Sequence, residues 1–206
     1  MKYLLCAFAL LFTSLSFADN SFKAGEHYQQ LDTPLSTTPK VVEYFSYYCP
    51  FCYNFEPIVA ELKQALPADT PLHKVPVAFL GGNMATTVQR AHAAAGVLQV
   101  EDAFTAALFN QIHQQRNAPQ SRADIKKLFA SIGVEAQQLD GHFDSMPVNS
   151  MIAEYDAAVT AADIRSVPSF VVNNKYLINI SAVSSQEQFN ALVNYLLNLP
   201  AEAKTE

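Results

Sequence analysis

Two cysteines separated by two residues are the part of this sequence best suited to chemistry. The run Cys49-Pro50-Phe51-Cys52 follows a β-rich segment, Val41 to Ser46, and opens a segment whose apolar residues have helical spacing. Because proline favours the first helical position, Cys49 should be the helix N-cap. Its sulfur would then face unpaired backbone N–H groups, chiefly those of Phe51 and Cys52, at the positive end of the helix dipole. A thiolate is stabilised at such a place, so we expect Cys49 to be acidified and reactive.

The second cysteine has the position that a dithiol/disulfide exchange cycle requires. Cys52 lies one turn into the same helix, so we expect it to be buried and able to attack a mixed disulfide at Cys49. A zinc site is an alternative, but there is no second CxxC, and none of the five histidines is paired at ligand spacing. A structural disulfide is another, although a two-residue loop constrains little chain. The strand–CxxC–helix context favours redox catalysis.

The N-terminal segment has the pattern of a secretory signal peptide. An apolar run from Leu4 to Phe12 follows Lys2, and Ser16-Phe17-Ala18 is a small-x-small cleavage site, so we expect residues 1–18 to be removed. A membrane anchor is less favoured, because a spanning helix needs about 20 apolar residues. Of the three cysteines, removal of Cys6 leaves two in an exported chain, where disulfides persist.

Composition excludes some partners. The 206 residues include 13 basic and 19 acidic side chains without a basic run, so we expect no nucleic-acid partner. No segment after the signal peptide is long and apolar enough to cross a bilayer, so the mature protein should not be embedded in the membrane. The histidines show no catalytic arrangement, and we expect most of them at the surface.

The elements that position the cysteines alternate strands and helices, with one interruption. The pattern predicts strands at Tyr28 to Leu31, Val41 to Ser46, Leu72 to Phe79, Ser169 to Val172 and Tyr176 to Ile180. Pro76 should mark the point where regular pairing of its strand stops. A helix is expected from Pro50 to Leu66, kinked at Pro57, and a last helix should start at a capping box, Ser184-x-x-Glu187, and end before Pro200.

Between about Met84 and Ile164 the sequence contains no convincing strand. Helical patterns cover 84–96, 101–116, 122–132, 135–143 and 148–163, and Met146-Pro147 separates the last two. The sequence therefore predicts an α/β domain, residues 19–80 and 165–206, with an all-helical insertion at 81–164.

Three segments of the sequence carry a resemblance to a known family. The run from Glu43 to Tyr53 closely resembles the active-site segment of the DsbA family of periplasmic thiol:disulfide oxidoreductases. Phe79 to Met84 and Val167 to Tyr176 are similar to two further segments of that family, in the same order. The resemblance covers essentially the whole chain after the signal peptide. It implies a thioredoxin fold with the helical insertion as a cap over the active site, and no cofactor besides the Cys49–Cys52 disulfide.

The resemblance also identifies Pro168 as a cis-proline facing the CxxC. The backbone of Val167 could then pair with an extended client strand beside Cys49. On the sequence alone, Val167-Pro168 fits a trans turn equally well.

Three charged residues are also part of the resemblance to the DsbA family. Glu43 lies on an otherwise apolar strand, and the resemblance makes it a buried acid near Cys52 that relays a proton, with its pKa raised by burial. A structural carboxylate satisfied by backbone or by a lysine is the alternative. Glu56 and Lys74 match the same charge cluster of the family, but an ordinary helix-face acid and strand lysine are equally consistent with the sequence.

The chain departs from the family at Phe51, where most members have histidine. Phenylalanine cannot add a positive charge or a donor beside the thiolate, whereas the backbone N–H groups after Pro50 remain. Some relatives without this histidine look specialised for few substrates, so the resemblance implies a narrow client set.

The expected function is a periplasmic oxidase. The disulfide of Cys49 and Cys52 would pass to reduced or unfolded exported proteins, and a DsbB-like, quinone-linked membrane protein would reoxidise the cysteines of what we expect to be a monomer. A disulfide isomerase or reductase is an alternative, although a DsbC-like isomerase has an N-terminal dimerisation domain for which little chain precedes Cys49. A third hypothesis is a chaperone that holds clients without turnover.

Overall fold

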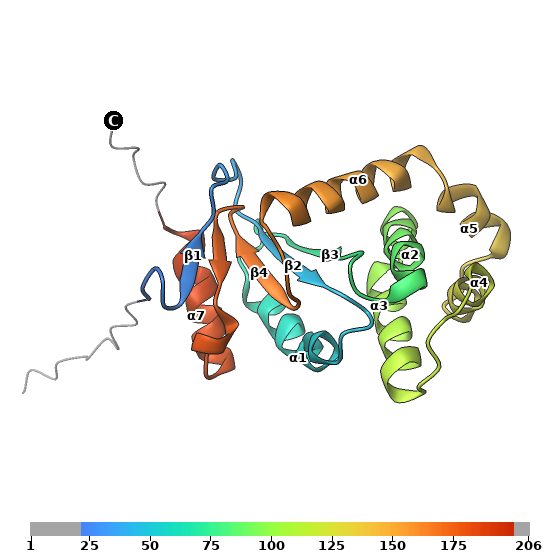
Figure 1. The fold of residues 1–206 in the computed structure, drawn as a ribbon, viewed down its shortest axis with the longest axis horizontal. Coiled ribbons are helices and arrows are strands. Elements are labelled where there is room, and N and C mark those ends of the chain that lie inside the picture. The colour runs from blue at the N-terminus through green and yellow to red at the C-terminus, as the bar shows by residue number, and fades with distance from the viewer. Residues whose placement is uncertain (1–21, 200–206) are drawn as a thin grey trace, which may run out of the picture.

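A computed structural model of the protein describes residues 22–199. The predicted signal peptide, residues 1–18, lies outside the described residues. The centre of the fold is a five-stranded mixed sheet, with helices on both of its faces (Figure 1). Its strands lie in the order β1 (Tyr28–Gln30), β5 (Tyr176–Ile178), β4 (Ser169–Val172), β2 (Val41–Phe45) and β3 (Leu72–Pro76). Only the β2–β3 pair among these is parallel.

The central strand β2 is buried along its whole length. Its neighbours cover both edges, and the register places Glu43 opposite Lys74 on β3 and opposite Phe170 on β4. β3 ends at Pro76, as predicted, because proline has no N–H with which to continue the ladder. The predicted continuation to Phe79 is wrong, although the N–H of Val77 still donates to the carbonyl of Phe45 at 2.8 Å.

Three helices cover the sheet. α1 (Pro50–Ala65) and α7 (Gln186–Leu197) pack on one face, and the C-terminal half of α6 (Met146–Ala161) packs on the other (Figure 1). Pro57 lies inside α1, as predicted. The layers agree with an α/β fold in which α1 leads directly out of the central strand.

The remaining helices form a second body beside the sheet (Figure 1). They are η1 (Gly82–Met84), α2 (Ala85–Val97), α3 (Glu101–Phe109), η2 (Asn110–Gln114), α4 (Arg122–Ser131) and α5 (Ala136–Phe143), followed by the first half of α6. Within the described chain, no strand lies between Pro76 and Ser169. The predicted all-helical stretch is therefore present, and it packs against the loop that carries the cysteines.

Two predicted helix boundaries inside this body are wrong. The segment 101–116 is not a single α-helix, because α3 ends at Phe109 and continues as the π-helical turn η2. α6 starts at Met146 and not at 148, because Pro147 occupies the second helical position, where its missing N–H leaves no helical bond unmade.

The last helix begins one residue later than the predicted capping box. Its N-cap is Ser185, whose hydroxyl accepts a hydrogen bond from the backbone N–H of Gln188 at 3.2 Å. The side-chain carbonyl of Gln188 in turn accepts from the backbone N–H of Ser184 at 2.7 Å. The partners are thus Ser185 and Gln188, one position beyond the predicted Ser184 and Glu187.

Candidate active site

Cys49 is the N-cap of α1, as the sequence predicted. Its backbone is extended, with φ −91° and ψ 113°, and Pro50 takes the first helical position. The Cys49 sulfur accepts a hydrogen bond from the backbone N–H of Cys52 at 3.2 Å. The side chain is only 4% exposed, so a reacting partner must bring its own sulfur close to the loop.

Cys52 has a different environment from Cys49 although the two share one turn. It is completely buried, as predicted, and both cysteines are free thiols in this structure. Burial raises the pKa of Cys52 well above its ordinary value, and the adjacent Cys49 side chain acts in the same direction. The inner sulfur therefore holds its proton, whereas the outer sulfur accepts a backbone hydrogen bond at the start of the helix.

The loop before β4 closes the site from the other side. The peptide bond between Val167 and Pro168 is cis, as the resemblance implied. The thiol of Cys49 donates to the carbonyl oxygen of Val167 at a sulfur–oxygen distance of 3.6 Å. The backbone at Val167 thus lies beside the outer cysteine, although the two residues are far apart in the sequence.

A buried charge cluster lies under the cysteines. The Nζ atom of Lys74 is 2.6 Å from Oε2 of Glu43 and 2.7 Å from Oε1 of Glu56. Glu43 is fully buried, and its Oε1 atom has no hydrogen-bond partner. The same ammonium group lies 4.6 Å from the centre of the Phe45 ring. The structure therefore brings the three predicted charged residues into one cluster.

Burial and charge act against each other in this cluster. Burial raises the pKa of Glu43 above its ordinary value, although the charge of Lys74 opposes the change. Burial alone would lower the pKa of Lys74, but the carboxylates of Glu43 and Glu56 outweigh it and raise that pKa. Lys74 thus stays charged, and Glu43 binds a proton more readily than a solvated glutamate does.

The comparisons with known proteins agree with this geometry. A family model described as a DSBA-like thioredoxin domain matches residues 40–194. The chain belongs to the DsbA family. The thiol:disulfide interchange protein DsbA of Pectobacterium carotovorum subsp. carotovorum is 33% identical over 201 residues, which cover 92% of this chain and 96% of that protein. The protein of the same name from Escherichia coli K12 is 31% identical over 205 residues, covering 95% and 98%.

Solved DsbA structures have the same fold. A complex of a Proteus mirabilis DsbA variant with a non-covalently bound peptide, PWATCDS, superposes with a TM-score of 0.80 at 32% identity, covering 85% of this chain and 98% of that one. The fold is therefore a thioredoxin fold with a helical insertion, and this DsbA-family chain is a thiol:disulfide oxidoreductase.

This DsbA-family chain also has active-site contacts that the sequence did not reveal. The hydroxyl of Tyr47 lies 2.7 Å from Nδ1 of His92 and 2.9 Å from the hydroxyl of Thr105, and all three side chains are buried. Burial lowers the pKa of His92 to about 3, so the imidazole is neutral at neutral pH. His92 is the one buried histidine of the five, an exception to the expectation that most of them lie at the surface. A lone histidine in an alanine-rich helix gives no sign of its partner.

A second unforeseen contact lies in the DsbA-like segment that begins at Phe79. The hydroxyl of Ser46 donates to the carbonyl of Leu80 at 3.2 Å and accepts from the N–H of Tyr48 at 3.1 Å. Gly81 follows with φ +126°, and a Cβ atom there would overlap the Tyr48 ring. Only glycine fits this position, because both the backbone angle and the space exclude a side chain.

The rim of the site in this DsbA-family chain is apolar. Phe51 is 74% exposed, and Phe79 and Leu80 are exposed as well. Among residues 22–199, no three His, Cys, Asp or Glu side chains come together as a metal site requires. The same part of the chain has no helix with the length and apolarity of a transmembrane span.

Proposed function

We propose that this DsbA-family protein oxidises pairs of cysteine thiols in exported proteins by giving them the Cys49–Cys52 disulfide. One observation supports this most directly. The Cys49 sulfur sits at the helix N-cap and accepts the N–H of Cys52 at 3.2 Å, while Cys52 itself is fully buried. An exchange enzyme needs such an asymmetry, because one sulfur must meet the client and the other must be shielded from it.

The proposed reaction starts from the oxidised protein. A client thiolate attacks the Cys49 sulfur, the Cys49–Cys52 bond breaks, and Cys52 leaves with the electron pair and takes up a proton. A second client thiolate then attacks the client sulfur of the mixed disulfide and releases Cys49 as a thiolate. The client dithiol is thereby oxidised to a disulfide, and the Cys49–Cys52 pair is reduced.

Glu43 is the proposed proton donor for the departing Cys52. Its buried carboxyl has a raised pKa and an oxygen, Oε1, without a partner, so it can hold and deliver a proton in the interior. Lys74 connects it to Glu56, which is 28% exposed and offers a route for exchange with solvent. In this proposal Glu56 and Lys74 are positioning residues, since neither is argued to touch the reacting sulfurs.

Clients are proposed to bind as extended segments beside the cis-proline loop. The backbone at Val167 and Pro168 lies next to Cys49, and the exposed rings of Phe51 and Phe79 can hold apolar residues near a client cysteine. The complex of Proteus mirabilis DsbA with the peptide PWATCDS supports a peptide as the ligand class. Because Phe51 replaces a polar imidazole by an apolar ring, we propose a narrower client set with apolar flanking residues.

The cellular setting is proposed from the family and from the predicted signal peptide. The protein would act as a monomer in the periplasm, without a cofactor other than its disulfide. A DsbB-like, quinone-linked membrane protein would reoxidise Cys49 and Cys52. This arrangement supplies the oxidant that each turnover of the proposed reaction consumes.

A Cys52→Ala variant tests the proposal. We expect it to lose turnover and to accumulate mixed disulfides between Cys49 and client proteins, visible on non-reducing gels. Cys49→Ser is the matched control and should form none. If the two variants still assist client folding as well as the natural protein, the chaperone alternative is correct. Equilibration with glutathione separates oxidase from reductase, because a potential near −270 mV, as in thioredoxin, would favour the reductase.

A further inference from the structure

The π-helical turn η2 places two consecutive side chains of the insertion against the catalytic helix. Nε2 of His113 lies 2.8 Å from the carbonyl oxygen of Tyr47, and the His113 ring stacks on Tyr53 with centroids 4.9 Å apart and planes 12° apart. The amide of Gln114 donates to the Tyr53 hydroxyl at 2.7 Å. π-Helical turns within helices are frequent at functional sites, because they redirect the side chains that follow.

These contacts hold both flanks of the redox motif. Tyr47 precedes Cys49 by two residues, and Tyr53 directly follows Cys52. A carbonyl oxygen can only accept a hydrogen bond. Nε2 of His113 must therefore carry the hydrogen and donate the hydrogen bond to the carbonyl oxygen of Tyr47. Because the N–H of Cys49 bonds to the carbonyl of Ser46 at 3.0 Å in the same turn, a displaced Tyr47 carbonyl would shift the outer cysteine.

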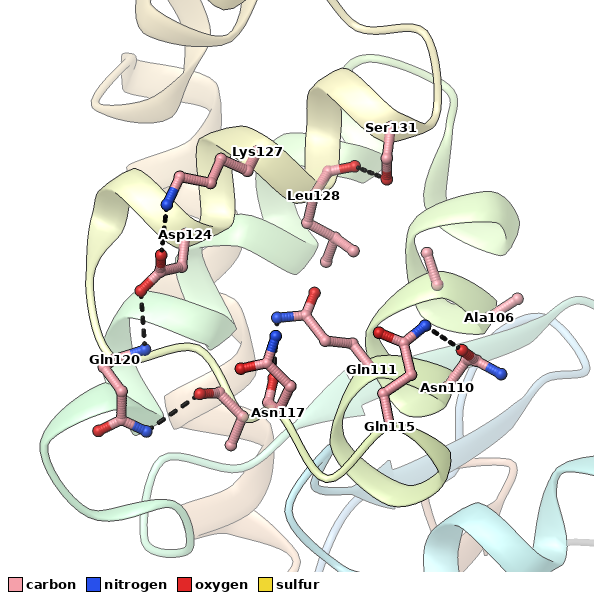
Figure 2. A pocket seen from close by; sticks show the side chains of 12 residues that line it. Ala106, Asn110, Gln111, Gln115, Asn117, Gln120, Asp124, Lys127, Leu128 and Ser131 are labelled. Atoms are coloured by element: carbon pink, nitrogen blue, oxygen red, sulfur yellow. Dashed lines mark hydrogen bonds and ion pairs between the residues drawn. The ribbon is translucent and has the colours of Figure 1, made fainter.

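The turn itself is held from its other side. Asn110, Gln111 and Gln115 line a cavity between α3 and α4, and Figure 2 shows these side chains. The volume of the cavity is about 520 Å³. There the amide of Gln115 donates to Oδ1 of Asn110 at 2.8 Å, and the amide of Gln111 donates to the carbonyl of Asn117 at 2.9 Å (Figure 2). His113 thus projects from a turn that is hydrogen-bonded on the face away from the cysteines.

We propose that His113 is a positioning residue for the disulfide exchange reaction. Its Nε2–H fixes the Tyr47 carbonyl, and with it the approach geometry of the Cys49 sulfur. The proposal rests on the role of Cys49 and Cys52 given above. It assigns to the insertion a direct part in the chemistry, since a side chain of its π-helical turn holds the loop in which the bond is exchanged.

Two substitutions separate the hydrogen bond from the ring. His113→Phe keeps an aromatic ring against Tyr53 but has no donor, whereas His113→Gln loses the ring and keeps an N–H that can reach the Tyr47 carbonyl. We expect His113→Phe to lower kcat for oxidation of a reduced two-cysteine peptide by about fivefold to tenfold, the value of one hydrogen bond, with KM unchanged. His113→Gln should restore kcat to within about twofold.

Controls keep the test independent of the proposed function and of stability. His142→Phe makes the same substitution in α5, at a site away from the cysteines, and should leave kcat unaltered. The inference is overturned if His113→Phe keeps the natural kcat, or if the Phe and Gln variants lose activity equally and in step with their thermal stability. Failure of the proposed function is distinct, because the natural protein would then not oxidise the peptide, or would oxidise it as fast after Cys49→Ser.

Discussion

The hydroxyl of Tyr47 lies 2.7 Å from Nδ1 of His92, in a buried contact between the lead-in to the redox motif and α2 of the helical insertion. The carbonyl of the same tyrosine meets His113 at 2.8 Å, so Tyr47 is held at both ends by the insertion. The catalytic loop is therefore shaped by residues from both bodies of the fold.

The buried imidazole of His92 should make stability depend on pH. Its pKa is about 3 in the folded protein, against 6.5 as its ordinary value, so the unfolded chain binds the proton more readily. The stabilising contribution is complete above pH 6.5 and is lost as the pH falls from about 6.5 toward 3, by about 1.4 kcal/mol per pH unit. Urea unfolding of the natural protein and of His92→Phe across this range measures the slope. The variant should show a flatter profile, and two parallel profiles would contradict the assignment.

The charge cluster should be sensitive to loss of its cation. Lys74→Met leaves the buried Glu43 and the partly exposed Glu56 without their shared cation and should lower the free energy of unfolding by about 3 kcal/mol. Adding Glu43→Leu should recover much of this loss, because an apolar replacement of a buried ion pair is often close to neutral. Denaturant unfolding of the two variants gives the comparison.

The matched control for that cluster is the exposed pair of Lys63 and Asp102, whose Nζ–Oδ2 distance is 3.1 Å. Lys63→Met should change the unfolding free energy by less than about 1 kcal/mol, since exposed pairs contribute little. Equal losses in Lys63→Met and Lys74→Met would show that burial of the cluster does not govern its energetics.

Gly81→Ala should distort the segment beside the cysteines. The substitution combines a φ of +126° with an overlap between the new Cβ and the Tyr48 ring, so we expect a loss of about 2–4 kcal/mol and slower exchange. Gly141→Ala is the control, because that glycine lies inside α5 with nothing within 4 Å of an added Cβ. It should be neutral or stabilising by up to about 1 kcal/mol. Similar unfolding midpoints for both variants would contradict the steric argument.

A histidine at position 51 should change the redox equilibrium. Phe51 is 74% exposed, so Phe51→His should alter stability by less than about 0.5 kcal/mol. A protonated imidazole beside Cys49 favours the thiolate of the reduced form, and we expect the glutathione equilibrium to shift toward reduced protein by up to about tenfold, or roughly 30 mV. Met146→His places the same residue on an exposed site at the start of α6 and should give no shift. If the equilibrium were unchanged in Phe51→His, the backbone around Cys49 alone would set the redox equilibrium of the cysteine pair.

The sequence predicted those parts of the fold that depend on local pattern. The order of strands and helices, the N-cap position of Cys49 and the end of regular pairing at Pro76 follow from periodicity and from proline chemistry. The boundaries failed where neighbouring positions offer similar chemistry. Ser184 and Ser185 are both competent caps, and only the geometry of the chain entering α7 selects the second.

The contacts between the two bodies could not be predicted in the same way. The meeting of Tyr47 with His92 joins residues whose local sequences give no sign of each other. The π-helical turn could not be predicted either, because its residues fit an ordinary α-helix. The wider turn brings His113 to the carbonyl of Tyr47, just before the redox motif. Such long-range pairs depend on packing between α2, α3 and the loop. The resemblance suggested the cluster of Glu43, Glu56 and Lys74. In the structure, Nζ of Lys74 lies 2.6 Å from a carboxylate oxygen of Glu43 and 2.7 Å from one of Glu56.

Both cysteines belong to the same apolar cluster as residues from α2 to α6. Excision of the insertion would therefore expose Phe45, Tyr47 and Cys52 to water. The remaining sheet domain would expose apolar surface and would be unstable, although its strands and the covering helices α1 and α7 would remain. Neither body can therefore be exchanged for that of an unrelated thioredoxin-like protein without rebuilding this shared apolar cluster.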